Sequence, residues 1–161
     1  MSVTYKEISR KYDQKISEII LKVGEEFGAV GEGFGPGDQE VLNMSLHYAD
    51  EKDSLYLIAI HDEEVVGGCG IAPFHPDKKI CELKKLFILP TARGLGIGKQ
   101  LTLKCLQYAK SKGYKQCYLD TLSNMHSAIA LYESLGFVHL DRPIDGTIHN
   151  KCDIWMLKDI T

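Results

Sequence analysis

The feature that most constrains this chain is a glycine-rich turn between a predicted strand and a predicted helix. The strand covers residues 80–89, the turn runs from Arg93 to Gly98, and the helical pattern ends before Gly113. A helix that starts in this way presents unpaired N–H groups and the positive end of its dipole. Glycines let the backbone approach a bound anion, and Arg93 and Lys99 add positive charge. The segment therefore predicts a phosphate- or pyrophosphate-binding site.

A purely structural turn is the alternative explanation of these glycines, and two nucleotide-binding motifs can be compared with them directly. A Walker loop needs Ser or Thr after its lysine, whereas Gln100 follows Lys99. A dinucleotide fingerprint needs the spacing GxGxxG, whereas glycines stand here at 94, 96 and 98. Asp120 could serve as the acid of that fingerprint, but 161 residues leave no room for a second βαβ half. Both nucleotide motifs are therefore disfavoured.

Hydrophobic periodicity predicts an α/β domain over residues 1–161, in which helices flank a mixed sheet. The predicted helices cover residues 16–27, a segment capped by Asp38 with Val41, Leu42, Ser45 and Leu46 on its inner face, residues 97–112, and a segment from a cap at Ser123 or Asn124 to Gly136. The predicted strands are 55–60, 65–72, 80–89, 117–120, 137–140 and 153–157, with 3–8 as an optional first strand. A glycine-rich loop is expected at 31–37 and a turn at 73–77.

Composition excludes several classes of protein. With 44% hydrophobic and 25% charged residues, the chain resembles an ordinary globular domain. No apolar run could cross a bilayer or serve as a signal peptide, so we expect a cytoplasmic protein without a membrane partner. The net charge of −3 argues against a nucleic-acid partner. The five cysteines form no CxxC pair, and four of them lie in apolar stretches, which indicates buried thiols rather than disulfides or a zinc site.

Two segments resemble motifs of the GNAT superfamily of N-acetyltransferases. Residues 82–90 (ELKKLFILP) with the turn 93–98 (RGLGIG) resemble its motif A, whose pyrophosphate loop reads [QR]-x-x-G-x-[GA]. Asn124, Ala128, residues 131–133 and residues 135–137 are similar to its motif B. The resemblance is specific from about residue 55 to 140 and weaker over the N-terminal helices.

The resemblance implies a mostly antiparallel central sheet of six to seven strands flanked by helices. It also implies an acyltransferase that uses acetyl-CoA as co-substrate, needs no metal, and acetylates a primary amine of a small molecule or peptide by direct attack. The cofactor-binding positions that it implies are Leu86, Phe87, Ile88, Arg93, Gly94, Leu95, Gly96, Ile97, Gly98, Lys99, Asn124, Ala128 and Tyr132. Tyr132 would protonate the leaving thiolate, and Glu82 falls where several members carry a general base.

The chemistry of these residues suits the implied roles. Asn124, Ala128 and Tyr132 are spaced i, i+4, i+8 on one helical face, and a phenol can donate a proton to a thiolate. A tyrosine on an apolar helix face is also a common core residue, and Glu82 could be an exposed strand charge. His75 and His126 are alternative bases.

The remaining histidines, His47, His61, His139 and His149, show no metal-ligand spacing. A non-catalytic acyl-CoA sensor with the same fold is the main alternative function. The first 53 residues carry 6 Lys/Arg and 11 Asp/Glu, which favours a cationic amine, although a solvated helix surface explains the same charges. A homodimer is compatible with the sequence.

Overall fold

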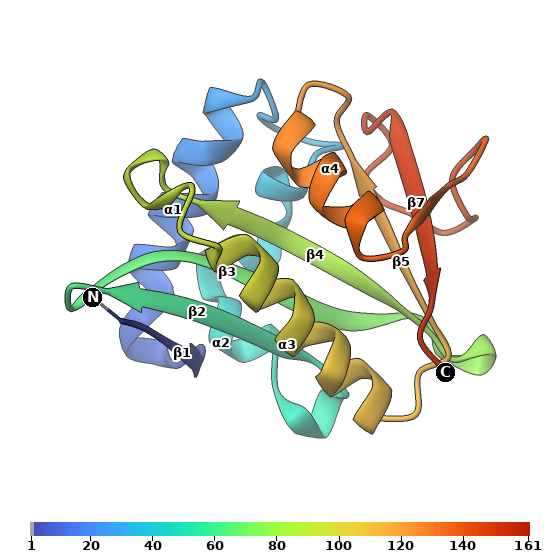
Figure 1. Cartoon of the computed structure of the whole chain (residues 1–161), viewed down its shortest axis with the longest axis horizontal. Coiled ribbons are helices and arrows are strands. Elements are labelled where there is room, and N and C mark those ends of the chain that lie inside the picture. Colours follow the sequence, from blue (N-terminus) through green and yellow to red (C-terminus); the bar gives the residue numbers. More distant parts are fainter. Residues whose placement is uncertain (1) are drawn as a thin grey trace.

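A seven-stranded sheet runs through the molecule, and helices cover both of its faces (Figure 1). The computed structural model describes residues 2–161. The strands are β1 (Val3–Glu7), β2 (Leu55–His61), β3 (Glu64–His75), β4 (Ile80–Ile88), β5 (Gln116–Thr121), β6 (Val138–His139) and β7 (Ile154–Asp159), in the order β1-β2-β3-β4-β5-β7-β6. The helices are α1 (Asp13–Glu26), α2 (Met44–His47), α3 (Ile97–Ser111) and α4 (His126–Ser134). Short 3₁₀ turns join them: η1 (Arg10–Tyr12), η2 (Gly35–Gly37), η3 (Gln39–Asn43), η4 (Asp50–Lys52), η5 (Pro76–Lys78) and η6 (Pro90–Ala92).

The predicted sheet is confirmed, including the optional first strand. All its neighbouring strands are antiparallel except β4 and β5. The parallel pairing covers only Ile80 to Glu82 on β4 and Gln116 to Tyr118 on β5. Both strands continue beyond this point but diverge, as Figure 1 shows. The edge of β4 that faces β5 is therefore without a neighbouring strand from Leu83 onward.

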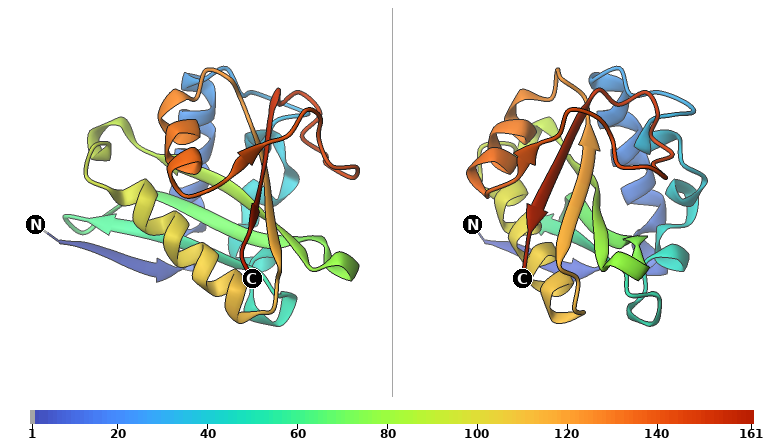
Figure 2. Two further views of the ribbon diagram at one scale, coloured as in Figure 1. Left: turned by 45° about the vertical axis from the view of Figure 1, so that its right-hand side comes forward. Right: turned by 90° about the vertical axis from the view of Figure 1, so that its right-hand side faces the viewer.

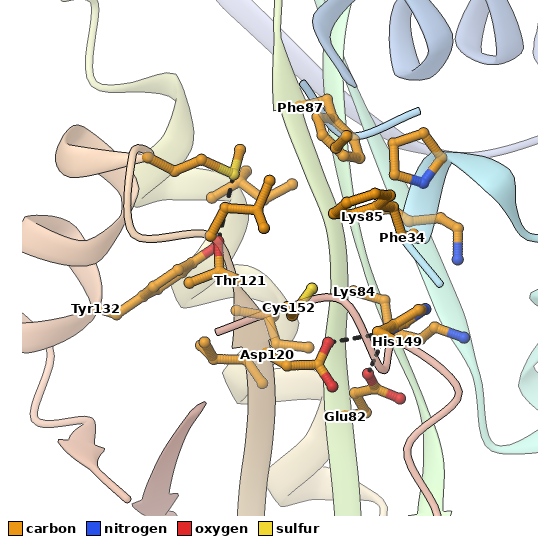
Figure 3. A pocket seen from close by; sticks show the side chains of 18 residues that line it. Phe34, Glu82, Lys84, Lys85, Phe87, Asp120, Thr121, Tyr132, His149 and Cys152 are labelled. Atoms are coloured by element: carbon orange, nitrogen blue, oxygen red, sulfur yellow. Dashed lines mark hydrogen bonds and ion pairs between the residues drawn. The ribbon is translucent and has the colours of Figure 1, made fainter. Parts of the chain in front are cut away.

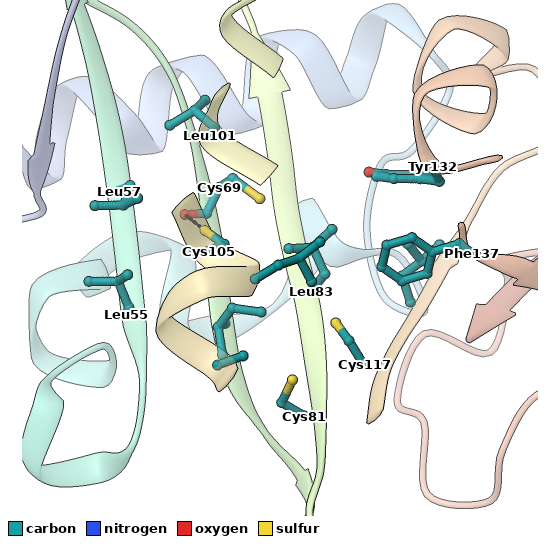
Figure 4. Close-up of a cluster of buried hydrophobic side chains, with 14 of the residues drawn as sticks. Leu55, Leu57, Cys69, Cys81, Leu83, Leu101, Cys105, Cys117, Tyr132 and Phe137 are labelled. Carbon is teal, nitrogen blue, oxygen red and sulfur yellow. Dashed lines mark hydrogen bonds between the residues drawn. The ribbon is translucent and has the colours of Figure 1, made fainter. Parts of the chain in front are cut away.

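Two apolar clusters hold the helices on the sheet. The helices α3 and α4 lie on one side of the sheet and α1 on the other (Figure 2). Four of the five cysteines, Cys69, Cys81, Cys105 and Cys117, are buried as free thiols in the cluster under α3 (Figure 4). The structural role predicted for them is confirmed. Within residues 2–161, no helix combines the length and the apolar character needed to span a membrane.

The glycines of β3 permit close contact with both neighbouring strands. A Cβ atom at Gly68 would lie 2.4 Å from the ring of Tyr56, and one at Gly67 would lie 2.6 Å from the carbonyl oxygen of Phe87. The register with β4 shifts between Gly68 and Gly70, where β4 has one residue more than β3. The predicted turn at 73–77 begins later than expected, because β3 continues to His75 and the 3₁₀ turn η5 follows it.

The second helix was predicted wrongly. The segment after Asp38 forms the 3₁₀ turn η3 and then the single-turn helix α2. Three residues per turn place Val41 and Met44 on the buried side, whereas Leu42 and Leu46 are 67% and 65% exposed. The carboxylate of Asp38 caps no helix, because it binds Lys85 and His149 instead.

The predicted caps of α4 are also wrong. This helix begins at His126, and its first N–H groups receive no side-chain cap. The backbone N–H and the hydroxyl of Ser123 both donate to the carboxylate of Asp153. The side-chain amide of Asn124 donates to the carbonyl oxygen of Phe27 at 2.9 Å. Each predicted cap therefore holds a loop against another part of the chain.

Candidate active site

A groove of about 500 Å³ lies at the N-terminal end of α3, between β4 and α4. Its floor is the end of β4, and one wall is the turn that precedes α3. Ten of the predicted cofactor-binding residues line it: Leu86, Phe87, Ile88, Arg93, Gly94, Gly96, Ile97, Gly98, Asn124 and Ala128. The remaining three lie elsewhere, since Leu95 is 54% exposed, Lys99 is exposed, and Tyr132 lines a neighbouring cavity. The ten predicted residues come from three separate segments of the chain, and Val23 and Phe27 at the end of α1 also line the groove.

The turn before α3 has a backbone shape that requires glycine. Gly94 and Gly96 have φ angles of +83° and +77°, in the left-handed region that side chains with a Cβ disfavour. A Cβ at either position would meet no atom within 4 Å, so the space in front of both is open. Gly98 is helical, and a Cβ there would lie 3.2 Å from the side chain of Ile88. The open space and the start of α3 together form a surface suited to an anion.

The C-terminal end of α1 is tied to this groove through two side chains. The guanidinium of Arg93 donates to the carboxylate of Glu26 at 2.6 and 2.8 Å, and to the carbonyl oxygen of Ile88 at 3.1 and 3.0 Å. The hydrogen bond from Arg93 lowers the pKa of Glu26. On the other side of the groove, Asn124 donates to Phe27, as described above. Arg93 therefore stands at the mouth of the groove with its charge already paired.

A second, smaller cavity of about 60 Å³ occupies the gap where β4 and β5 diverge (Figure 3). Leu86, Phe87 and Met125 line both this cavity and the groove, so the two spaces adjoin. Glu82 and Tyr132, the two predicted catalytic residues, both line the smaller cavity. The structure thus brings together two residues that are 50 positions apart in the chain.

Tyr132 is 6% exposed, and its hydroxyl points from α4 toward the sheet (Figure 4). Its ring packs edge-on against Phe137, with the ring centroids 5.7 Å apart. Burial raises the pKa of Tyr132 above its usual value of 10, so the phenol holds its proton at neutral pH. The residue is therefore both a core side chain and a proton donor that lines the cavity.

Glu82 lies in a buried cluster of charges that the sequence did not reveal. His149, from the loop between β6 and β7, places its Nδ1 atom 2.8 Å from Asp120 Oδ1 and 3.3 Å from Glu82 Oε2 (Figure 3). Its Nε2 atom lies 2.8 Å from Asp38 Oδ2. In the sequence, Asp120 matches only the acid of a dinucleotide fingerprint, and no spacing connects it with His149. Glu82 is 7% exposed, so the alternative of an exposed strand charge is wrong.

Among the described residues, Glu82, Asp120 and His149 form the one group of three side chains that could hold a metal ion. Ligand atoms of Glu82, Asp120 and His149 all lie within 4.8 Å of one another. Both ring nitrogens of His149 are already within hydrogen-bonding distance of carboxylates. Burial alone would lower the pKa of His149. Hydrogen bonds to Asp120, Asp38 and Glu82 outweigh the effect of burial and raise the pKa to about 11. The protonated ring lies within ion-pair distance of all three carboxylates.

The other candidate bases and nucleophiles lie in less suitable places. His75 is bonded to the backbone oxygen of Asp145 at an exposed position, and His126 lines the groove rather than the smaller cavity. Cys152 lines the smaller cavity, but burial and the charges of nearby carboxylates raise the pKa of its thiol to about 12. A thiol that keeps its proton is a weak nucleophile. Glu82, in contrast, lines the smaller cavity together with Tyr132.

Comparisons with known proteins identify the family of this chain. The sequence model of the Acetyltransferase (GNAT) family matches residues 25–137. A protein of Escherichia coli K12, named as the uncharacterized N-acetyltransferase YjgM, is 37% identical over 147 residues, which cover 90% of this chain and 87% of that protein.

Two solved structures share the fold along almost the whole chain. A GNAT-family acetyltransferase of Staphylococcus aureus Mu50 superposes with a TM-score of 0.86 at 22% identity, covering 99% of this chain and all of the other. The PaiA N-acetyltransferase of Thermoplasma acidophilum, solved in complex with coenzyme A, gives a TM-score of 0.78 at 21% identity and covers 99% of each chain. The family match, the bacterial relative and the shared fold lead to one conclusion: this chain belongs to the GNAT family of acetyltransferases.

Proposed function

We propose that this acyltransferase moves the acetyl group of acetyl-CoA to a primary amine of a small molecule or peptide. The observation that carries the proposal is that the groove and the cavity containing Glu82 and Tyr132 share Leu86, Phe87 and Met125 as walls. A thioester held along the groove would therefore end beside a base and an acid. The complex of the Thermoplasma acidophilum relative with coenzyme A supports the choice of co-substrate.

In this proposal the groove holds acetyl-CoA by its diphosphate and its pantetheine arm. Backbone N–H groups at the start of α3 would bind the diphosphate, and the free edge of β4 would pair with the amides of the arm. The missing strand beside β4 is the feature that permits this pairing, because its backbone groups need partners. Leu95 and Lys99 are left with, at most, a backbone role, since neither side chain lines the groove.

Glu82 and Tyr132 divide the proton transfers between them. The amine nitrogen attacks the thioester carbon, forming the C–N bond as the C–S bond breaks. Glu82 takes one proton from the attacking nitrogen, directly or through a water in the cavity, and Tyr132 gives one proton to the departing sulfur. The products are an amide and coenzyme A thiol, and one proton passes from Glu82 back to Tyr132 through solvent to complete the cycle.

A non-catalytic acyl-CoA sensor is the competing function. A sensor needs the groove but has no use for a base and an acid in the adjoining cavity. Thiol release from acetyl-CoA should be measured with a panel of amines that includes polyamines, amino acids, aminoglycosides and peptide N-termini. Release that depends on one amine class supports the enzyme, whereas binding of acetyl-CoA without release for any amine supports the sensor.

A further inference from the structure

The strongest unassigned feature of the molecule is the set of charges packed behind Glu82. His149 is 4% exposed and is surrounded by three carboxylates from three segments: Asp38 before η3, Glu82 on β4 and Asp120 at the end of β5. The loop that carries His149 belongs to no regular element. A loop residue becomes buried to this extent only when specific contacts hold it there.

The contacts on both sides of the ring fix its orientation. On the Nδ1 side, the hydroxyl of Thr147 donates to Asp120 and accepts a hydrogen bond from the backbone N–H of His149. On the Nε2 side, Asp38 also binds the ammonium group of Lys85 at 2.7 Å. Lys85 has a φ angle of +56° and so forms a bulge in the middle of β4. The ring is thus connected through Asp38 to the bulge that shapes the floor of the cavity.

The carboxylates around the ring differ in how many partners they have. Asp38 has Lys85 besides His149, and Asp120 has Thr147 besides His149. Among the described residues, Glu82 has one partner within ion-pair distance, which is His149. Carboxylate oxygens of Glu82 and Asp120 lie within 4.8 Å of each other, and two negative charges this close repel unless a positive charge lies between them. The ring of His149 occupies that position.

We propose that His149 is a positioning residue of the acceptor site, which orients the carboxylate of Glu82 so that it can take a proton from the substrate amine. This inference rests on the proposed function, because it assigns His149 a task in that reaction. His149 itself does not receive the proton, since its two ring nitrogens already share protons with carboxylates. Its effect passes through Glu82, whereas the groove for the co-substrate lies on the other side of Leu86 and Phe87.

The first test compares His149→Gln with wild type in steady-state kinetics. We expect kcat/KM for the amine to fall about 10- to 100-fold, as for a misplaced catalytic group, while the KM for acetyl-CoA stays within about twofold. His139→Gln is the matched control, since His139 is an exposed histidine at the end of β6, next to the same loop, and its contact is Glu133.

Other titratable groups lie near the ring. Asp38 contacts the ring directly, Lys85 contacts Asp38, and Glu40 contacts both Lys84 and Lys85. Cys152 lines the same cavity as the ring. The double variant Glu82→Gln/His149→Gln separates the effect on Glu82 from these. If His149 acts through Glu82, the double variant should be no slower than Glu82→Gln alone.

Two outcomes would overturn the proposal: additive losses in the double variant, or an equal loss of affinity for acetyl-CoA. If His149→Gln does not fold, Asp38→Asn replaces it, because that change weakens the ring's contact on the Nε2 side and should lower kcat/KM for the amine by a smaller factor. A wild-type protein that releases no thiol with any amine would refute the proposed function instead. In that case an NMR titration can still show whether Glu82→Gln changes the pKa of the His149 ring. An unchanged pKa would reject the interaction between His149 and Glu82.

Discussion

The Nε2 atom of His149 lies 2.8 Å from the Oδ2 atom of Asp38, although 111 positions separate them in the sequence. This contact joins the loop after β6 to the loop that precedes η3. The backbone N–H of Lys151 donates to the carbonyl oxygen of Gly33 at 3.1 Å and strengthens the same junction. Because both charged side chains are buried, the junction depends on a protonated ring and an ionised carboxylate.

The stability of the protein should therefore depend on pH through His149. The pKa of the ring is raised to about 11, against the ordinary value of 6.5. The folded protein keeps a proton that the unfolded chain releases, so this contribution is full below pH 6.5 and is lost as the pH rises toward 11. Asp38 has the opposite pH dependence. Burial alone would raise its pKa, but contacts with His149 and Lys85 lower the pKa to about 2. The contribution of Asp38 to stability is therefore present above pH 3.8 and is lost as the pH falls toward 2.

Thermal melting of wild type and His149→Gln from pH 6 to 10 tests this linkage. The wild-type Tm should fall across that range more steeply than the variant's Tm. The smaller variant His149→Ala should lose about 3–5 kcal/mol at pH 7, because it leaves buried carboxylates unpaired. Parallel pH curves for wild type and His149→Gln would show that the ring is neutral in the folded protein.

Chelation tests the alternative explanation of the same cluster. If a protonated ring holds Glu82 and Asp120, prolonged dialysis against EDTA should leave both Tm and the rate of thiol release unchanged. A metal bound there would have to displace the proton shared between His149 and Asp120, and its removal would lower the Tm. A loss of Tm that one divalent cation restores would therefore assign the cluster to that cation.

The sequence predicted the sheet and the groove because both depend on local patterns. Alternating apolar residues predict the strands. The glycines at 94 and 96 predict the turn, because its backbone has positive φ angles at both positions, which glycine adopts readily. The cluster around His149 depends on contacts between loops far apart in the chain, for which no periodicity exists. The prediction of a helix capped by Asp38 is wrong for the same reason. The carboxylate that was expected to cap the helix binds Lys85 and His149, which are far away in the sequence.

Tyr132→Phe should lower kcat and leave the affinity for acetyl-CoA nearly unchanged. The hydroxyl acts on charge that develops as the thiolate departs, and a positioned general acid typically contributes 10²–10⁴-fold. The ring keeps its packing against Phe137, so Tm should change little. Tyr114→Phe is the control, since Tyr114 lies in the same core but bonds to the carbonyl oxygen of Asp53. A wild-type rate in Tyr132→Phe would make Tyr132 a core residue only.

Gly96→Val should abolish binding of coenzyme A without unfolding the protein. The side chain would project into the open groove from a residue with a φ angle of +77°. Gly113→Val is a matched control, because Gly113 has a φ angle of +87°, faces open space and lies at the far end of α3. Both changes should cost about 1–2 kcal/mol of backbone strain. Only Gly96→Val should lose the rise in Tm that coenzyme A produces, and an equal rise in both variants would reject the groove as the binding site.

Glu26→Gln should bind coenzyme A more tightly than wild type. The carboxylate of Glu26 holds the guanidinium of Arg93 at the mouth of the groove, so a phosphate that binds Arg93 must compete with it. Exposed ion pairs contribute about 0.2–1 kcal/mol, which corresponds to a gain in affinity of up to about fivefold. Glu25→Gln removes the same charge from the neighbouring residue and controls for long-range repulsion of phosphates. Calorimetric titration at low and high salt measures the difference between the two variants. Equal affinities for coenzyme A in Glu26→Gln and Glu25→Gln would show that Arg93 stays bound to Ile88 and does not meet the diphosphate.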